Sequence, residues 1–363
     1  MAKRSVGKPK FYADYPSYLK AIGYYKGTYS EGFKDSVTDK DIESLFNMNP
    51  AQPVSLELES NLFPPFFQDD FKIGIKFQED DEDPNKELIE LLKTTNYAGL
   101  IGHNLMSMAN NNADSSVVHM EMGFSNTIED LTESNKLVNF QNVEYNGYSL
   151  WETGGFTSDD NAYKNAFLNV SYYSADAVQE FTAKLGSFTF GRVFEPEFAF
   201  DLQATLSTSY EGVKSQTSVG GSTLTNIQHT GQPSWSENLP AWTLEKQKGH
   251  DYKVGGSMGR RSWKVSLSFM ADDNVFSKAG NENKFFTWTD QTDGTSGEPE
   301  YTFDSSLSSF FKLTLNGKLP FIFCPDSSAT DLEFALCRIS NQPTFKQVAN
   351  NMFSTSLTLV ETY

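Results

Sequence analysis

The sequence predicts a mainly β protein, in which a β-sandwich framework carries an inserted jelly-roll domain and a few short helices. Apolar and polar residues alternate with a period of two in many short runs, which is typical of strands with one wet face. Aromatic residues make up 14% of the 363 residues and charged residues only 21%. This balance suits half-buried pleated surfaces and large interfaces, so it favours a β-rich protein with much apolar surface to bury.

The central stretch predicts the domain organisation. It begins with the apolar run Tyr97–Leu105 and ends with the alternating run Lys184–Phe194, with strand-like runs and no long helix between them. We expect a sandwich or jelly-roll of residues 95–194 whose first and last strands lie near each other. Residues 1–94 then form an N-terminal arm with the first framework strands, and residues 195–363 form the C-terminal β-sandwich framework.

The N-terminal segment is too rich in aromatic residues between positions 10 and 25 for a solvated tail. Either this arm packs on its own body, or a neighbouring subunit orders it. A second aromatic corner at residues 63–67 exposes its rings unless something covers it. The aromatic residues that we assign to a candidate assembly interface are Phe11, Tyr12, Tyr15, Phe63, Phe66 and Phe67.

Capping signals predict two short helices in residues 1–94. Thr38 and Asp41 form the pattern of a capping box for a helix over residues 38–46, which Asn49 and Pro50 end. Asp83 and Pro84 begin a second helix that runs to residue 93. The run of acidic residues at 78–83 predicts a solvated loop. A calcium site there is the alternative, but the spacing and glycine of an EF-hand loop are missing.

Further alternating runs predict the remaining strands. They cover residues 54–60, 71–77, 116–122, 137–143, 166–173, 198–210, 260–270, 319–324, 334–339 and 352–361. A loop is expected from residue 219 to 224, and a long one from 276 to 301. Residues 307–315 predict a helix with Phe310, Phe311 and Leu315 on one side.

Few residues suggest enzyme chemistry. His103 has no second histidine or cysteine at ligand spacing, so we expect a packed, hydrogen-bonded histidine rather than a base or metal ligand. Glu195 and Glu197 could serve a hydrolase only with a sugar groove between them. We expect Arg260 and Arg261 to pair with local charges. Nucleophile elbows, phosphate loops and dinucleotide fingerprints are missing, so we expect no enzyme, no cofactor and no metal.

The charge and the cysteines restrict the partners. A net charge of -18 argues against nucleic acid, since a nucleic-acid binder carries a basic face. The one basic cluster, Lys3, Arg4, Lys8 and Lys10, is read as a solvated arm, with an acidic partner surface as the alternative. No apolar run reaches eighteen residues, so membrane insertion is not expected. Cys324 and Cys337 are expected to be reduced and packed, although a hairpin that pairs them stays open.

Several short motifs together resemble a known family. Leu100–Leu105, followed about eighty residues later by Leu185–Arg192, resembles the discoidin-like, galactose-binding-type β-sandwich found in virion proteins of tailed bacteriophages. The later motifs in the same order are Ser218–Ser222, Arg260–Phe269, Pro320–Asp326 and Phe353–Glu361. The resemblance covers roughly residues 95–363 and does not extend to the aromatic N-terminal segment.

The resemblance implies a structural subunit of a phage tail, baseplate or neck that assembles into a ring. Its partners would be copies of itself and other virion proteins, and its location the virion after synthesis in the host cytoplasm. The alternative is a carbohydrate- or receptor-binding tail module, with a host surface glycan as partner. Tyr145, Tyr148 and Trp151 lie in an amide-rich stretch and are the candidate glycan-binding residues, against the interpretation that they are core and cross-strand pairs.

Overall fold

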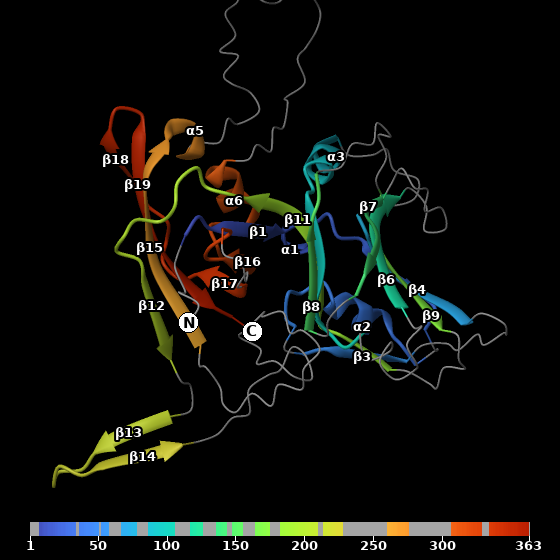
Figure 1. Ribbon diagram of the computed structural model, residues 1–363, viewed down its shortest axis with the longest axis horizontal. Helices are drawn as coiled ribbons and strands as arrows, with labels where there is room; N and C mark the ends of the chain where they lie inside the picture. Colours follow the sequence, from blue (N-terminus) through green and yellow to red (C-terminus); the bar gives the residue numbers. More distant parts are fainter. Residues whose placement is uncertain are drawn as a thin grey trace, which may run out of the picture.

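The mainly β fold is confirmed by a computed structural model of the chain (Figure 1). Every strand pair in it is antiparallel. The structure describes residues 7–33, 36–50, 52–57, 67–77, 86–105, 117–125, 136–143, 147–154, 164–174, 182–209, 213–227, 260–275, 306–328 and 334–362. The acidic run at 78–83 and the long loop expected at 276–301 lie outside these residues.

The largest sheet has ten strands, which come from the N-terminal, central and C-terminal parts of the chain. In spatial order these are β12 (Thr205–Ser209), β15 (Arg260–Ala271), β19 (Met352–Glu361), β17 (Ala335–Ile339), β16 (Phe321–Cys324), β1 (Lys10–Asp14), β11 (Ser187–Phe194), β5 (Tyr97–His103) and β8 (Gly147–Glu152), with β18 (Phe345–Ala349) paired to β19. Strand pairing therefore crosses the boundaries near residues 94 and 194 that the sequence suggested.

A second sheet of five strands lies beside one end of the first. Its order is β2 (Gly27–Glu31), β4 (Phe67–Lys76), β9 (Asn165–Ser174), β6 (Val117–Ser125) and β7 (Lys136–Asn142). Two small sheets complete the described part, β3 (Val54–Glu57) with β10 (Thr182–Leu185), and β13 (Val213–Thr217) with β14 (Thr223–Ile227).

The two large sheets pack face to face through aromatic rings. Phe190 of β11 lies with its ring centroid 5.6 Å from Phe124 of β6 and 6.3 Å from Phe77, which follows β4. In the same core β5 pairs with β11, with Ala98 opposite Phe190 and Leu100 opposite Phe188. The prediction that the first and last strands of the central module are neighbours is thus confirmed, and both strands lie against the second sheet.

Strand β1 is a central strand of the ten-stranded sheet. It pairs with β11 on one side and β16 on the other, and both of its faces are covered. The ring of Phe11 packs 5.0 Å from that of Phe310, and the ring of Tyr12, on the other face, packs 5.2 Å from that of Tyr97. The aromatic arm thus packs on its own body.

The described helices are short: α1 (Tyr15–Ala21), α2 (Asp39–Ser44), α3 (Lys86–Lys93), α5 (Asp272–Val275) and α6 (Leu307–Leu313). Capping side chains begin α1, α2 and α6. Asp14 accepts the Ser17 backbone N–H at 2.9 Å and begins α1. The predicted capping box of Thr38 and Asp41 is present at α2. Such a box satisfies backbone N–H groups that the first helical turn leaves without partners.

Three sequence expectations differ from the structure. The strand expected over residues 198–210 is shorter, because β12 begins only at Thr205. The loop expected at 219–224 is the turn and first strand residues of the β13–β14 hairpin. The helix expected over 307–315 ends at Leu313, and Leu315 follows it with a φ of 50° and a largely exposed side chain.

Candidate assembly surface

Three of the six aromatic residues that the sequence assigned to an assembly interface are buried within the chain. Phe11, Tyr12 and Tyr15 are at most 1% exposed and belong to the core of the chain, so they offer no surface to a neighbour. Phe67 is the first residue of β4, and Phe63 and Phe66 lie outside the described residues. Phe11, Tyr12 and Tyr15 therefore do not form an assembly surface.

The candidate glycan-binding residues do not form one surface. Tyr148 is 3% exposed and packs with Tyr12 and Tyr97 on one face of β8, while Trp151 is half-buried against the core on the other face. Residues three apart in a strand point in opposite directions, because side chains alternate. Tyr145 lies outside the described residues. Tyr148 and Trp151 thus cannot stack on the same sugar ring.

His103 is a packed, hydrogen-bonded histidine, as predicted. A β-bulge at Gly102, which has a φ of 74°, turns the His103 ring toward Ser149, whose Oγ lies 3.0 Å from Nε2. The side chain is fully buried, and burial lowers its pKa to about 3. The imidazole is therefore neutral at physiological pH and part of the core packing.

Arg261 forms a buried ion pair, which confirms the expected charge partner for this residue. Its Nη2 lies 2.7 Å from Oε1 of Glu361 and its Nε 3.1 Å from Oε2, so the contact is bidentate. Arg261 is 3% exposed and Glu361 is fully buried. The ion pair connects β15 to β19, its neighbour in the ten-stranded sheet.

Salt bridges hold the described basic and acidic side chains near the N-terminus. Lys8 pairs with Glu195 at 2.9 Å, and Lys10 with Glu152 at 2.7 Å. Lys3 and Arg4 lie outside the described residues.

Glu197 lies at the rim of a cleft that residues 196–198 form with β15. The lining of this cleft is mostly apolar, unlike that of a sugar groove.

The two cysteines are free and buried. In the β16–β17 pairing Phe321 lies opposite Cys337 and Phe323 opposite Ala335, so Cys324 lies beyond the end of the register and does not face Cys337. Burial raises the pKa of the Cys324 thiol to about 11. The expectation of two reduced, packed thiols is confirmed.

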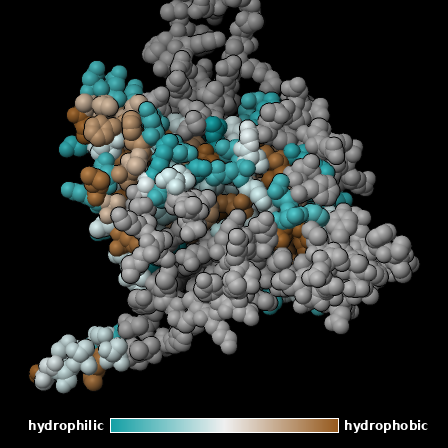
Figure 2. Space-filling view, in the orientation of Figure 1, coloured by the Kyte–Doolittle hydropathy of each residue, from teal (hydrophilic) through white to brown (hydrophobic). Residues whose placement is uncertain are grey.

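One end of the ten-stranded sheet carries most of the exposed apolar side chains. We call this end, made of β12, β15, β18, β19, residues 197–204 and the β13–β14 hairpin, the apolar end. Eight of the ten large apolar residues that are exposed in the described chain lie there, namely Phe198, Leu202, Leu206, Val219, Leu224, Phe269, Phe345 and Val348. Figure 2 shows this concentration at the left of the molecule and at the tip of the hairpin. Exposed apolar side chains that form a contiguous patch are typical of contact surfaces.

Strand β12 at the apolar end is an unprotected edge. Within the described chain it pairs only with β15, and all five of its residues, Thr205–Ser209, are exposed. Edge strands normally carry lysine, proline or another device that prevents pairing with a second chain. The sequence Thr-Leu-Ser-Thr-Ser carries none of these.

The β13–β14 hairpin extends away from the body of the protein (Figure 1). It forms a two-stranded sheet of its own, and its turn, Ser218–Ser222, is held by hydrogen bonds from Ser218 N to Ser222 O and from Gly221 N to Ser218 O. Val219 at this turn is completely exposed. An isolated two-stranded hairpin is marginally stable in water, so a contact partner would stabilise it.

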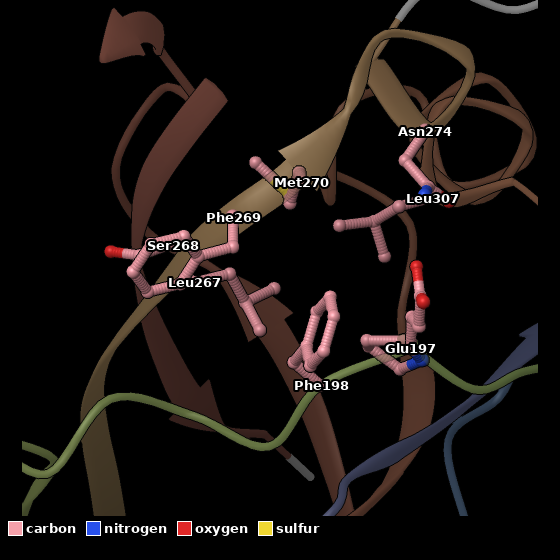
Figure 3. Close-up of a pocket in the computed structure, with 9 residues that line it drawn as sticks. Glu197, Phe198, Leu267, Ser268, Phe269, Met270, Asn274 and Leu307 are labelled. Carbon is pink, nitrogen blue, oxygen red and sulfur yellow. The ribbon is translucent and has the colours of Figure 1, made fainter. Parts of the chain in front are cut away.

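The apolar end also contains a cleft, drawn in Figure 3. Buried Leu267, Met270 and Leu307 line it together with the exposed ring of Phe198. Phe269 on its wall has a φ of 64° in a β-bulge of β15 and is 57% exposed. A bulky residue in this backbone region is a genuine outlier.

The sequence contains a signal for the apolar end that motif reading missed. Residues 202–227 carry only two charged residues, Glu211 and Lys214, in a chain in which charged residues make up 21%. A long polar but nearly uncharged stretch, rich in serine and threonine, has the composition of strands that can pair with another chain.

Comparisons with known protein families, with curated proteins and with solved structures find no match. The resemblance to phage tail proteins therefore stays a prediction. Where the structure describes the chain, no three His, Cys, Asp or Glu side chains are grouped so as to hold a metal ion. No helix in the described ranges is long and apolar enough to span a membrane.

Proposed function

We propose that this chain is a structural subunit that assembles with copies of itself through its apolar end. The observation that carries the proposal is the coincidence there of an unprotected edge strand, an extended hairpin and eight exposed large apolar side chains. Burial of such side chains contributes about 1.5–3 kcal/mol each. The closed ring of a phage tail, baseplate or neck is the setting that the family resemblance implies, and it is part of the proposal.

The net charge of the chain shows why assembly needs an apolar contact. A charge of -18 repels a second copy at long range. Within this end, β12 carries no charged residue and the β13–β14 hairpin carries only Lys214, whereas β15 and β18 carry Arg260, Arg261, Lys264 and Lys346. β12 and the hairpin are therefore the strands through which two acidic copies approach at low electrostatic cost.

The oligomeric state tests the proposal directly. Mass photometry of the purified chain over a dilution series is expected to show growth from monomers to one closed oligomer, and electron microscopy of that species is expected to show a ring. A chain that stays monomeric at every concentration, light scattering at high concentration included, contradicts the proposal and directs attention to the alternative, a glycan-binding module.

A further inference from the structure

The cleft at the apolar end has the construction of a site for one apolar side chain. Its floor is made of Leu267, Met270 and Leu307, all at most 6% exposed. The half-exposed ring of Phe198 stands at its wall, and Phe269 also lines it, although its ring points away from Phe198 and Leu307 (Figure 3). The cleft is small and open to solvent, so it suits a single side chain better than a large cofactor.

The bulge beside the cleft holds Phe269 in a strained backbone conformation, with a φ of 64°. Ser268 and Phe269 occupy the irregular step between Leu267 and Met270 in the β15–β19 pairing. The Ser268 hydroxyl donates to Asp201 Oδ2 at 2.8 Å and ties the bulge to residues 197–204. Strained conformations are concentrated at functional sites, where they aim a side chain at a partner.

Val219 is an exposed apolar side chain that matches the apolar lining of the cleft. It lies on the hairpin, away from the cleft of its own chain. Figure 1 shows the hairpin extending from the lower end of β12, while α5 and the bulged end of β15 lie at the top of the view. Two backbone hydrogen bonds close the turn that presents Val219. The nearest charge on the hairpin is that of Lys214, and the rim of the cleft carries the carboxylate of Glu197.

We propose that the β13–β14 hairpin of one copy docks at the cleft of the next copy, with Val219 between Phe198 and Leu307. This inference rests on the proposed self-assembly and names its contact. The contact is heterologous, since the hairpin and the cleft are different surfaces of one subunit. A repeated heterologous contact generates a ring when its rotation closes.

Engineered cysteines test the contact. The double variant Val219→Cys/Asn274→Cys places one thiol on the turn and one on α5 at the rim of the cleft. Mild oxidation is expected to produce a ladder of covalent oligomers. A mixture of the two single variants is expected to stop at the covalent dimer, because each chain then has one thiol of the contact. Cys324 and Cys337 remain in place because they are buried.

Controls separate this contact from random collision. Val219→Cys mixed with Lys26→Cys, an exposed position next to β2 on the other sheet, is expected to give no covalent dimer. Without oxidation, Val219→Asp is expected to raise the concentration at the assembly midpoint about tenfold or more, since a carboxylate replaces a buried methyl pair. Val219→Ile is expected to assemble like the unchanged chain.

The outcomes distinguish the two proposals. If the unchanged chain assembles but the double variant gives no ladder and Val219→Asp assembles normally, the docking of the hairpin is wrong and self-assembly stands. If the double variant gives only a dimer, the contact is isologous and the head-to-tail arrangement is wrong. If the unchanged chain never assembles, the proposed function fails and this inference with it.

Discussion

Asp14 is a fully buried carboxylic acid at the junction of β1 and α1. It accepts hydrogen bonds from the Ser17 backbone N–H and from the Thr189 hydroxyl at 2.9 and 2.7 Å. These bonds favour the carboxylate, but desolvation by burial is the larger effect and raises the pKa to about 6 from 3.8. Asp14 therefore holds its proton more tightly in the folded chain than in the unfolded chain.

The raised pKa predicts how stability depends on pH. The contribution of Asp14 is fully present below about pH 4 and is lost as the pH rises through 6, a difference on the order of 3 kcal/mol. Urea unfolding of the chain and of Asp14→Asn from pH 4 to 7 measures it. The free energy of unfolding of the unchanged chain minus that of Asp14→Asn is expected to fall with pH and level off above pH 6. The titration of His103 is common to both and cancels. A difference that is independent of pH contradicts the prediction.

The buried pair of Arg261 and Glu361 predicts a large effect of one substitution. Glu361→Gln removes the charge that compensates the Arg261 guanidinium and leaves it buried, which typically costs about 3–5 kcal/mol of unfolding free energy. Glu43→Gln is the matched control, since Glu43 pairs with Lys20 at 2.9 Å on the surface, where an ion pair contributes about 0–1 kcal/mol. Chemical denaturation compares the two. Equal small losses would show that the buried pair is not a stabilising contact.

At the scale of elements, the strands with one wet face are readable from sequence. β15 has the burial alternation that its residues predict, and α2 has its capping box. β1 is different, because its neighbours β11 and β16 are about 180 and 310 residues further along the chain and local pattern contains no information on such pairing. The sequence does not predict β18, because all five of its residues are exposed and no buried face gives them an alternating pattern.

The same reasoning explains what the sequence revealed of the candidate site. The high density of aromatic residues correctly indicated that much apolar surface is buried. Phe11, Tyr12 and Tyr15, however, bury their rings within the chain and not in an interface. Exposure depends on tertiary packing, so an aromatic core strand and an aromatic interface have the same local pattern. The low charge of residues 202–227 is the feature of the apolar end that sequence does contain.

The unprotected edge of β12 predicts the effect of a protecting residue. Thr208→Lys places an ammonium group on the exposed edge strand and is expected to weaken self-association about tenfold, since pairing would desolvate the charge. This is expected although the added lysine reduces the net negative charge. Ser30→Lys on β2, the exposed end strand of the five-stranded sheet, is expected to have no effect. Mass photometry measures assembly and thermal unfolding checks the fold. Equal effects of both lysines would contradict a role for the β12 edge.

At the scale of the whole molecule, two opposing forces act on assembly, and salt changes only one of them. The charge of -18 repels neighbouring copies over about a Debye length, which falls from about 20 Å at 20 mM salt to about 6 Å at 300 mM. The apolar contacts proposed here are not weakened by sodium chloride. Raising the salt is therefore expected to lower the concentration at the assembly midpoint. Light scattering over a salt series at fixed protein concentration measures this. Val219→Asp, which weakens the apolar contact, is expected to need a higher protein concentration than the unchanged chain at every salt concentration. Dissociation of the unchanged chain by salt would instead show that ion pairs hold the subunits together, and the apolar end would not be the assembly surface.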